Sequence, residues 1–258
     1  MKFNAAITGL GWVGRRSMGR PGNIRELETV GGLPEIRRKD VLPRPYKPFG
    51  RMDRFSKMGF AAIAFALEDA GMTGDSSPKD IGLVASTWTG CMETDIDYWR
   101  TVLQNAPSPA LFAYTLDSCF LGEASICFGL TGEHYVINEQ CCDGRSALFF
   151  ALESLCMGPS KAFVCGICNS GINFQGRTLS LFNALGDRSL LTAELIKKPC
   201  REFLPGALFF VLEPPGEDSL MMISADSPQS IYDSDNHEID DIFDLVIKYS
   251  PDMGILNQ

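Results

Sequence analysis

Apolar residues follow two kinds of spacing along this chain. Short unbroken apolar runs are typical of buried β-strands, and apolar residues spaced three and four apart are typical of helices. The clearest helix is predicted at Met52–Ala70 and ends at Gly71, a residue type common at helix C-termini. Within this segment Phe55, Met58 and Ala62 share one face. The pattern therefore predicts a long helix with one apolar stripe.

The same spacing rules predict alternating strands and helices elsewhere. Strands are predicted at Met1–Thr8, Ile81–Ser86, Tyr135–Asn138, Ala162–Ile167, Ala207–Leu212 and Leu220–Ser224. Helices are predicted at Glu93–Gln104, Gly122–Phe128, Gly144–Met157, Ser189–Lys197 and Ile239–Tyr249. The last two strands are placed to form a hairpin, and a short apolar stretch at 253–256 follows the last helix. This alternation predicts an α/β fold with a mostly buried sheet.

One segment lacks either spacing. Residues 14–50 are rich in Gly, Pro and Arg and are predicted to form an irregular surface excursion. No repeat or linker of biased composition interrupts the chain, so we expect one domain over residues 1–258. Residues 226–258 are expected to add an acidic helix and a short strand to it.

The composition excludes several classes of protein. With 45% hydrophobic and 21% charged residues, the chain is neither collagen-like nor broadly disordered. Its longest apolar runs, such as Phe60–Leu67, are shorter than the roughly 20 residues of a membrane helix. Met1–Thr8 resembles a strand rather than a leader, so we expect nine reduced cysteines in the cytoplasm. A pI of 4.8 argues against nucleic-acid binding.

The charge is distributed unevenly. Residues 1–57 contain 13 Lys and Arg and 5 Asp and Glu, whereas residues 217–258 contain 1 and 10. The first segment therefore carries a net charge of +8 and the last −9, within a total of −9. A basic front end on an acidic protein is either a docking surface for an acidic partner or ordinary solvated charge.

A glycine motif near the start indicates a dinucleotide site at first sight. Gly9, Gly11 and Gly14 spell G-x-G-x-x-G directly after a predicted strand. Such a site needs a helix that starts inside the motif and holds the pyrophosphate. Gly19 and the pair 21–22, Pro-Gly, would end that helix within about two turns. No cofactor is therefore expected.

The cysteine and histidine spacings do not predict a metal site. Cys165 and Cys168 form a C-x-x-C, but no second pair stands at zinc-binding spacing. Both lie in an apolar strand, which favours buried structural cysteines. The sequence has two histidines, His134 and His237, and neither belongs to a metal-ligand motif. His237 falls in an acidic segment and is expected to be exposed.

The candidate nucleophile is Cys141. The predicted strand at 135–138 leads into Cys141-Cys142-Asp143-Gly144 and then into a long apolar helix. A thiol before a helix lies at the positive end of the helix dipole, which lowers its pKa and supplies N–H groups to an oxyanion. A cysteine in such a place is also compatible with packing alone, so its neighbours must decide.

Several segments occur in an informative order. They are ITGLGWVG, RMDRFSKMGFAAIAFALEDAGM, DIGLVASTWTG, TLDSCFLGEASICFGLTG, YVINEQCCDG, KAFVCGICNS and KPCREFLPGALFFVLEP. By their number and order they resemble the β-ketoacyl synthases, the condensing enzymes of fatty-acid and polyketide synthesis. The likeness covers about residues 1–225. It implies one half of a thiolase-like fold, an α/β unit with a five-stranded mixed sheet and helices on its faces.

The resemblance also implies site residues. Cys141 to Gly144 keep the family's C-x-x-G spacing, so Cys141 takes the place of the nucleophile that accepts an acyl group from acyl carrier protein. Gln140 departs from the family's usual small residue, and Cys142 is a second candidate thiol. The basic residues before the first long helix fall where the family meets its carrier protein: Arg44, Lys47, Arg51 and Arg54.

Two expected catalytic histidines have no match. In the family they stabilise the enolate formed during decarboxylation, and neither His134 nor His237 fits their motifs. Two functions follow from this. The chain is either an acyltransferase whose condensation needs histidines from another chain, or a non-catalytic partner like the chain-length factors. A third interpretation is that the chain is an unrelated α/β protein whose motifs match those of the family by chance.

Both family functions require a partner. Half of this pseudo-symmetric fold leaves an apolar face exposed. We therefore expect a homodimer, or a heterodimer with a ketosynthase or with a separate C-terminal half.

Overall fold

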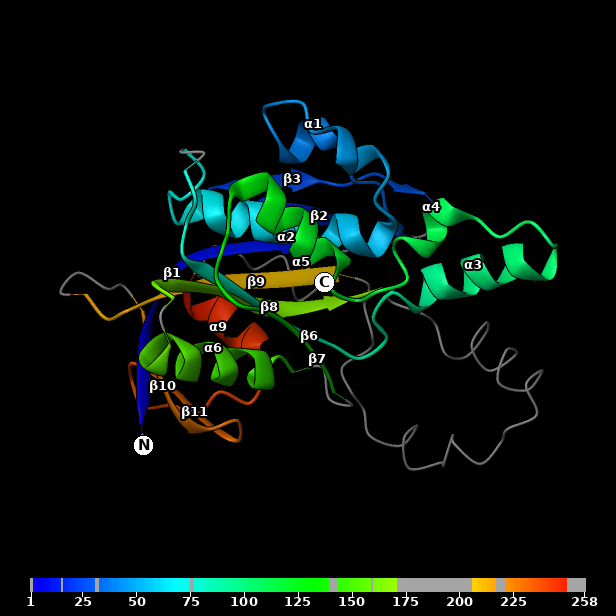
Figure 1. The fold of residues 1–258 in the computed structure, drawn as a ribbon. Helices are drawn as coiled ribbons and strands as arrows, with labels where there is room; N and C mark the ends of the chain where they lie inside the picture. The colour runs from blue at the N-terminus through cyan, green and yellow to red at the C-terminus, as the bar shows by residue number, and fades with distance from the viewer. Residues whose placement is uncertain are drawn as a thin grey trace, which may run out of the picture.

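The fold is built on one mixed β-sheet (Figure 1). The computed structural model describes residues 2–14, 16–30, 33–74, 77–139, 143–158, 160–170, 206–216 and 221–249. Over these residues the sheet has nine strands, and its main path runs in the order β11-β10-β1-β9-β8-β6-β7. The strands of this path are β1 (Phe3–Val13), β6 (Ile81–Thr87), β7 (His134–Asn138), β8 (Ala162–Asn169), β9 (Gly206–Glu213), β10 (Met222–Ser227) and β11 (Ser230–Asp233).

Strand number and pairing correct two expectations. The sheet has nine strands rather than the expected five, because all six strands predicted from the sequence belong to it and β11 and a β2–β3 hairpin are added. Strands β7 and β8 each pair parallel to β6, whereas β9 pairs antiparallel to both β8 and β1. The expected hairpin between β9 and β10 is wrong, because β1 lies between them and pairs with both.

Residues 14–50, expected to be irregular, contain short regular elements. Strands β2 (Ser17–Arg20) and β3 (Asn23–Glu26) form a hairpin that extends β1 at its end. The two-residue strands β4 (Thr29–Val30) and β5 (Leu33–Pro34) pair with each other. A short α1 (Arg38–Val41) and the 3₁₀ helix η1 (Lys47–Gly50) follow. Elements of two to four residues are too short to give a detectable apolar period, so the prediction of irregular structure failed here.

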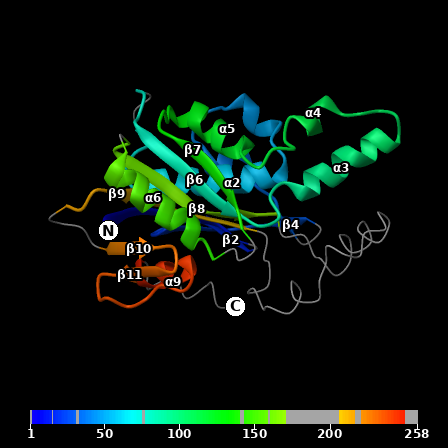
Figure 2. The same cartoon turned by 60° about the horizontal axis from the view of Figure 1, so that its bottom comes forward.

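Helices cover both faces of the sheet (Figures 1 and 2). On one face lie α2 (Arg54–Asp69) and α5 (Cys119–Phe128), and on the other α6 (Arg145–Met157) and α9 (Ile242–Tyr249). The sheet separates two buried apolar clusters, one under each pair. A further pair, α3 (Met92–Leu103) and α4 (Pro109–Phe112), projects from one end as an arm.

The glycine motif serves packing rather than phosphate binding. Strand β1 continues through the motif to Val13, so no helix begins there. A Cβ added at Gly9 would lie 2.4 Å from the Ala66 carbonyl oxygen, and one at Gly11 would lie 2.3 Å from that of Ala62. Glycine therefore allows β1 to approach the backbone of α2. The expectation that this motif is no dinucleotide site agrees with this geometry.

Helix α2 has a defined start. The Oδ1 atom of Asp53 accepts a hydrogen bond from the Ser56 N–H at 2.9 Å, which satisfies one of the free donors of the first turn. Twelve residues of the helix are buried, among them Phe60, Phe65 and Leu67. The helix is therefore central to the core on its face of the sheet.

Two of the expected elements lie outside the described ranges: the helix at 189–197 and the apolar stretch at 253–256. Among the described helices, none combines the length and apolarity needed to cross a membrane.

Candidate functional site

The carboxyl ends of three neighbouring parallel strands meet at one edge of the sheet. Strand β6 ends at Thr87, β7 at Asn138 and β8 at Asn169. This edge is where open α/β folds place their ligands. In the sequence, Cys141 and Cys142 fall between β7 and α6, but both lie outside the described residues.

A buried polar network joins two of these strand ends. The Asn169 Oδ1 atom accepts hydrogen bonds from the Thr87 hydroxyl at 3.2 Å and the Trp88 N–H at 3.1 Å. Just beyond them, the Thr89 and Ser170 hydroxyls lie 3.2 Å apart. The network ties the end of β6 to the end of β8.

Asp117 connects the third strand end to the arm. Its Oδ2 atom accepts a hydrogen bond from the Asn138 amide at 3.3 Å, and its Oδ1 atom accepts one from the Cys91 N–H at 2.7 Å. A Cβ at Gly90 would lie 1.9 Å from the same carboxylate, and Gly90 has a φ of 50°. Glycine is therefore required where the chain turns from β6 into α3.

The residues that follow the cysteine pair have strict steric demands. Gly144 has a φ of 74°, and a Cβ there would lie 2.1 Å from the Ile242 Cγ2 atom of α9. Only glycine fits, which gives a physical reason for the glycine of the C-x-x-G spacing. The neighbouring Asp143 carboxylate binds the Arg145 side chain at 3.0 Å and its N–H at 3.0 Å. The start of α6 is thus tightly held.

Glu139 adds a partly buried acid two residues before Cys141 in the sequence. Its Oε1 atom is inaccessible to solvent and lacks a hydrogen-bond partner among the described residues. Burial raises the pKa of this carboxyl, whereas the nearby Ser146 and Ser86 hydroxyls act in the opposite direction. Glu139 is not among the site residues predicted from the sequence, although the sequence places an acid directly before a strand-to-helix turn.

Four of the described cysteines are not activated thiols. Burial raises the pKa of Cys91, Cys119, Cys127 and Cys165, and that of Cys127 reaches about 11. These groups remain protonated at neutral pH and are poor nucleophiles.

The C-x-x-C pair behaves as expected. Cys165 packs in the cluster under α6 and α9, whereas Cys168 packs in the cluster under α2 and α5. The two thiols therefore lie on opposite faces of β8 and cannot share a metal ion. Both are buried structural residues.

Neither histidine lies at the carboxyl ends of β6, β7 and β8. His134 is the first residue of β7, and burial lowers its pKa. His237 follows β11, on the opposite edge of the sheet, and its side chain is 71% exposed, as expected. It lies near Asp233 and Asp235, but the Asp233 carboxylate already binds the Lys248 ammonium group, so this cluster gives no argument for a metal.

The four predicted docking residues have different surroundings. Arg54 forms an ion pair with Glu93 at 3.3 Å, and Arg44 donates to the Cys127 carbonyl at 3.5 Å. Arg51 is exposed at the end of η1. Lys47 lines a surface groove.

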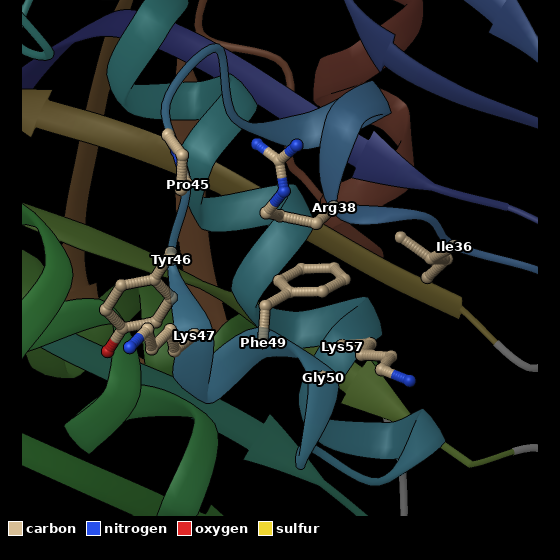
Figure 3. A pocket seen from close by; sticks show the side chains of 8 residues that line it. All are labelled: Ile36, Arg38, Pro45, Tyr46, Lys47, Phe49, Gly50 and Lys57. Carbon is tan, nitrogen blue, oxygen red and sulfur yellow. The ribbon is translucent and has the colours of Figure 1, made fainter.

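This groove lies between α1, η1 and α2 and has a volume of about 460 Å³ (Figure 3). Its cations are Arg38, Lys47 and Lys57, and none of them is ion-paired within the described part of the chain. The Lys57 ammonium group lies 5.9 Å from the centre of the Phe49 ring, an aromatic residue of the floor. The remaining lining residues are Ile36, Pro45, Tyr46 and Gly50.

Arg38 and Lys57 are not among the docking residues predicted from the sequence. They are 19 positions apart in the sequence, and only the packing of α1 beside α2 brings them to one groove. The high density of Lys and Arg in residues 1–57 was the available signal.

Comparison with known proteins identifies the fold. A family model described as "Beta-ketoacyl synthase, N-terminal domain" matches residues 44–211. The chain belongs to the β-ketoacyl synthase family. The expected α/β, thiolase-like class is confirmed for this chain, apart from the number of strands. No curated relative matches the chain.

Solved ketosynthase structures share the fold at low sequence identity. The ishigamide ketosynthase/chain length factor has a TM-score of 0.60 and 18% identity over 83% of this chain and 59% of its own. A β-ketoacyl synthase from Burkholderia phymatum STM815 has a TM-score of 0.57 and 22% identity, over 86% and 63%. The chain thus spans about 60% of the length of these two proteins.

A third matching structure contains a chain of about the same length as this one. The structure of the ketosynthase ApeO in complex with its chain length factor ApeC, from Xenorhabdus doucetiae, gives a TM-score of 0.53 and 14% identity. The match covers 83% of this chain and 80% of that chain, so the two are of similar length.

Proposed function

We propose that this chain is one subunit of a two-chain ketosynthase assembly and that Cys141 accepts an acyl group from acyl carrier protein. One observation carries the proposal: the C-x-x-G segment follows β7, the outermost of three parallel strands in a ketosynthase fold, and Gly144 is sterically required there. In the sequence α6 begins four residues after Cys141, and helix N-termini favour thiolates.

The proposed chemistry is thioester exchange. The Cys141 thiolate attacks the carbonyl carbon of the carrier-bound thioester, and a new carbon–sulfur bond forms. The carrier's thiolate leaves with the electron pair and takes up the proton released by Cys141. Condensation with a second unit then requires histidines from the other chain, because neither His134 nor His237 lies at this edge.

Carrier protein is proposed to dock on the basic front end. Arg44, Lys47, Arg51 and Arg54 were expected to hold it, and we retain Lys47 and Arg51 as the primary contacts. Arg54 is engaged with Glu93 and Arg44 with a backbone carbonyl, so both are less available. Lys57 and Phe49 extend the surface into the groove. Arg38 also lines the groove, but it donates to the Leu42 and Arg44 carbonyls at 3.2 and 2.9 Å and is as engaged as Arg44.

The second chain is proposed to bind at the β7 edge and the arm. Strand β7 ends the sheet, so one row of its backbone groups has no strand beside it within the described chain. Large apolar side chains are exposed on β7, on α5 beside it and along the arm: Tyr135, Ile126, Trp99, Leu103, Phe112 and Leu116. Such a surface is typical of protein interfaces. A homodimer and a heterodimer with another ketosynthase both fit it.

A non-catalytic, chain-length-factor-like role is the second candidate. It is favoured by the positions of His134 and His237, neither of which lies at the carboxyl ends of β6, β7 and β8. In this role Cys141 would carry no acyl group, and the chain would shape the acyl-binding surface of an active ketosynthase. We place either role in the cytoplasm and in fatty-acid or polyketide biosynthesis.

Acyl transfer tests the two roles directly. The protein, with and without a co-expressed ketosynthase, is incubated with acyl carrier thioester and digested for mass spectrometry. The acyltransferase role requires an acyl adduct on Cys141 that is lost in Cys141→Ala and retained in the matched Cys142→Ala variant. Stable ketosynthase binding without any adduct would instead establish the chain-length-factor-like role.

A further inference from the structure

One carboxylate holds two distant segments of the chain. The Glu123 Oε2 atom accepts a hydrogen bond from the Tyr46 hydroxyl at 2.9 Å, and its Oε1 atom accepts one from the Tyr114 hydroxyl at 3.0 Å. The Tyr46 hydroxyl also lies 3.3 Å from the Glu123 carbonyl oxygen. We call Tyr46, Glu123 and Tyr114 the tyrosine clamp.

Both phenols are held in place as donors. Burial and the Glu123 carboxylate raise the pKa of Tyr114 to about 12 and raise that of Tyr46 as well. The Tyr46 ring stacks on Phe60 of α2, with ring centres 5.8 Å apart and planes 10° apart. Tyr114 is buried. Hydrogen bonds to a charged acceptor in partly buried surroundings are stronger than neutral ones.

The two ends of the clamp belong to different surfaces. Tyr46 lines the groove and directly precedes Lys47 and η1 (Figure 3). Tyr114 follows α4, the second helix of the arm, whose Phe112 ring contacts Tyr98 of α3 at 5.4 Å. Glu123 lies on α5, between them. The basic groove and the apolar arm are therefore tied to the same side chain.

We infer that Glu123 is a positioning residue that couples the groove to the arm, so that carrier docking at one and partner contact at the other depend on one another. This inference rests on the proposed function for the identity of the groove's ligand. Its physical basis is that both tyrosines donate to the same carboxylate. If either tyrosine moves, the Glu123 carboxylate can shift, and the hydrogen bond to the other tyrosine changes. Such coupling between sites is reciprocal.

The test is to change the clamp at the end remote from the groove. Tyr114→Phe removes one hydroxyl, keeps the ring and leaves every groove residue intact. It should weaken binding of fluorescently labelled acyl carrier protein by about fivefold or more, the lower end of ordinary coupling between sites. It should also increase amide hydrogen exchange at residues 44–50. Tyr46→Phe should weaken carrier binding to a similar extent. In the double variant, the fold-loss of affinity should be smaller than the product of the two single fold-losses.

The control is Tyr98→Phe, which removes a phenol hydroxyl from the same arm but outside the clamp. It should bind carrier protein and exchange hydrogen like the unmodified protein. In Glu123→Gln one amide oxygen remains as an acceptor, so this variant should fall between the unmodified protein and Glu123→Ala.

Equal binding and equal exchange in Tyr114→Phe and Tyr98→Phe would overturn the inference. If the unmodified protein does not bind carrier protein, the proposed docking fails, while the exchange measurement still decides the coupling. The two ideas can therefore fail separately.

Discussion

Asp69, the last residue of α2, links three parts of the fold. Its Oδ2 atom accepts hydrogen bonds from the Leu10 N–H at 3.0 Å and the Tyr249 hydroxyl at 3.3 Å, and Arg20 lies 4.0 Å away. Strand β1 has a register irregularity between Ile7 and Gly9, just before Leu10. Burial raises the pKa of Asp69 despite these favourable partners.

A raised pKa gives a definite sign of pH dependence. The folded state binds the proton of Asp69 more tightly than the unfolded state, so its contribution is complete at low pH and is lost as the pH rises through the folded value. Asp69→Asn keeps an acceptor oxygen and removes this titration. The stability of the unmodified protein relative to Asp69→Asn should therefore be higher at pH 4 than at pH 7, by urea unfolding. An equal difference at both pH values would contradict this.

At the scale of single residues, the sequence predicts the chemical type of a site residue better than it predicts which other side chains contact that residue. The prediction that Cys165 and Cys168 are buried is confirmed, because side chains of an apolar strand within the sheet lie in the core on either face. The sequence predicts Arg54 as a docking residue, but it does not predict the ion pair with Glu93, which depends on the position of α3 beside the start of α2. Long-range contacts of this kind leave no trace in local spacing.

The start of α2 is the clearest case in which one side chain organises two elements. Asp53 caps the helix through its Oδ1 atom, and its Oδ2 atom accepts a hydrogen bond from the Thr94 hydroxyl of α3. Thr94 is itself buried. The cap therefore also ties the base of the arm to the core.

Asp53→Ala should lower the free energy of unfolding by about 1–2 kcal/mol, the usual cost of a lost helix N-cap. The variant also leaves the buried Thr94 hydroxyl without this acceptor, which places the loss at the upper end. Asp53→Asn, which keeps an oxygen for the Ser56 N–H, should lose less. Chemical denaturation of the three proteins measures this, and equal losses in both variants would contradict the capping role.

At the scale of elements, the long segments were predictable and the short ones were not. Helix α2 and strand β8 were found within two residues at each end, because their apolar residues repeat over two or more turns or form an unbroken run. The hairpin of β2 and β3 was missed, since four residues do not define a period. Strand pairing was misassigned for β9 and β10 because β1, far away in sequence, separates them.

At the scale of the whole molecule, the uneven charge of the sequence has a structural counterpart. The +8 front end supplies the three cations of the groove, while the acidic last segment supplies α9, whose Ile242, Leu245 and Val246 are buried against the sheet. A basic groove on a chain with a net charge of −9 favours an acidic ligand at that one place. The β7 edge and the arm form the separate, apolar surface.

The central claim is that this chain works as a subunit, and both candidate functions require it. Native mass spectrometry at micromolar concentration, alone and after co-expression with a ketosynthase, measures this directly. We expect the spectra to show a homodimer or a complex with the ketosynthase. Tyr135→Asp on β7 should dissociate it, whereas Ile24→Asp, at a similarly exposed position on β3, should not. A 28.3 kDa monomer under both conditions would contradict the account.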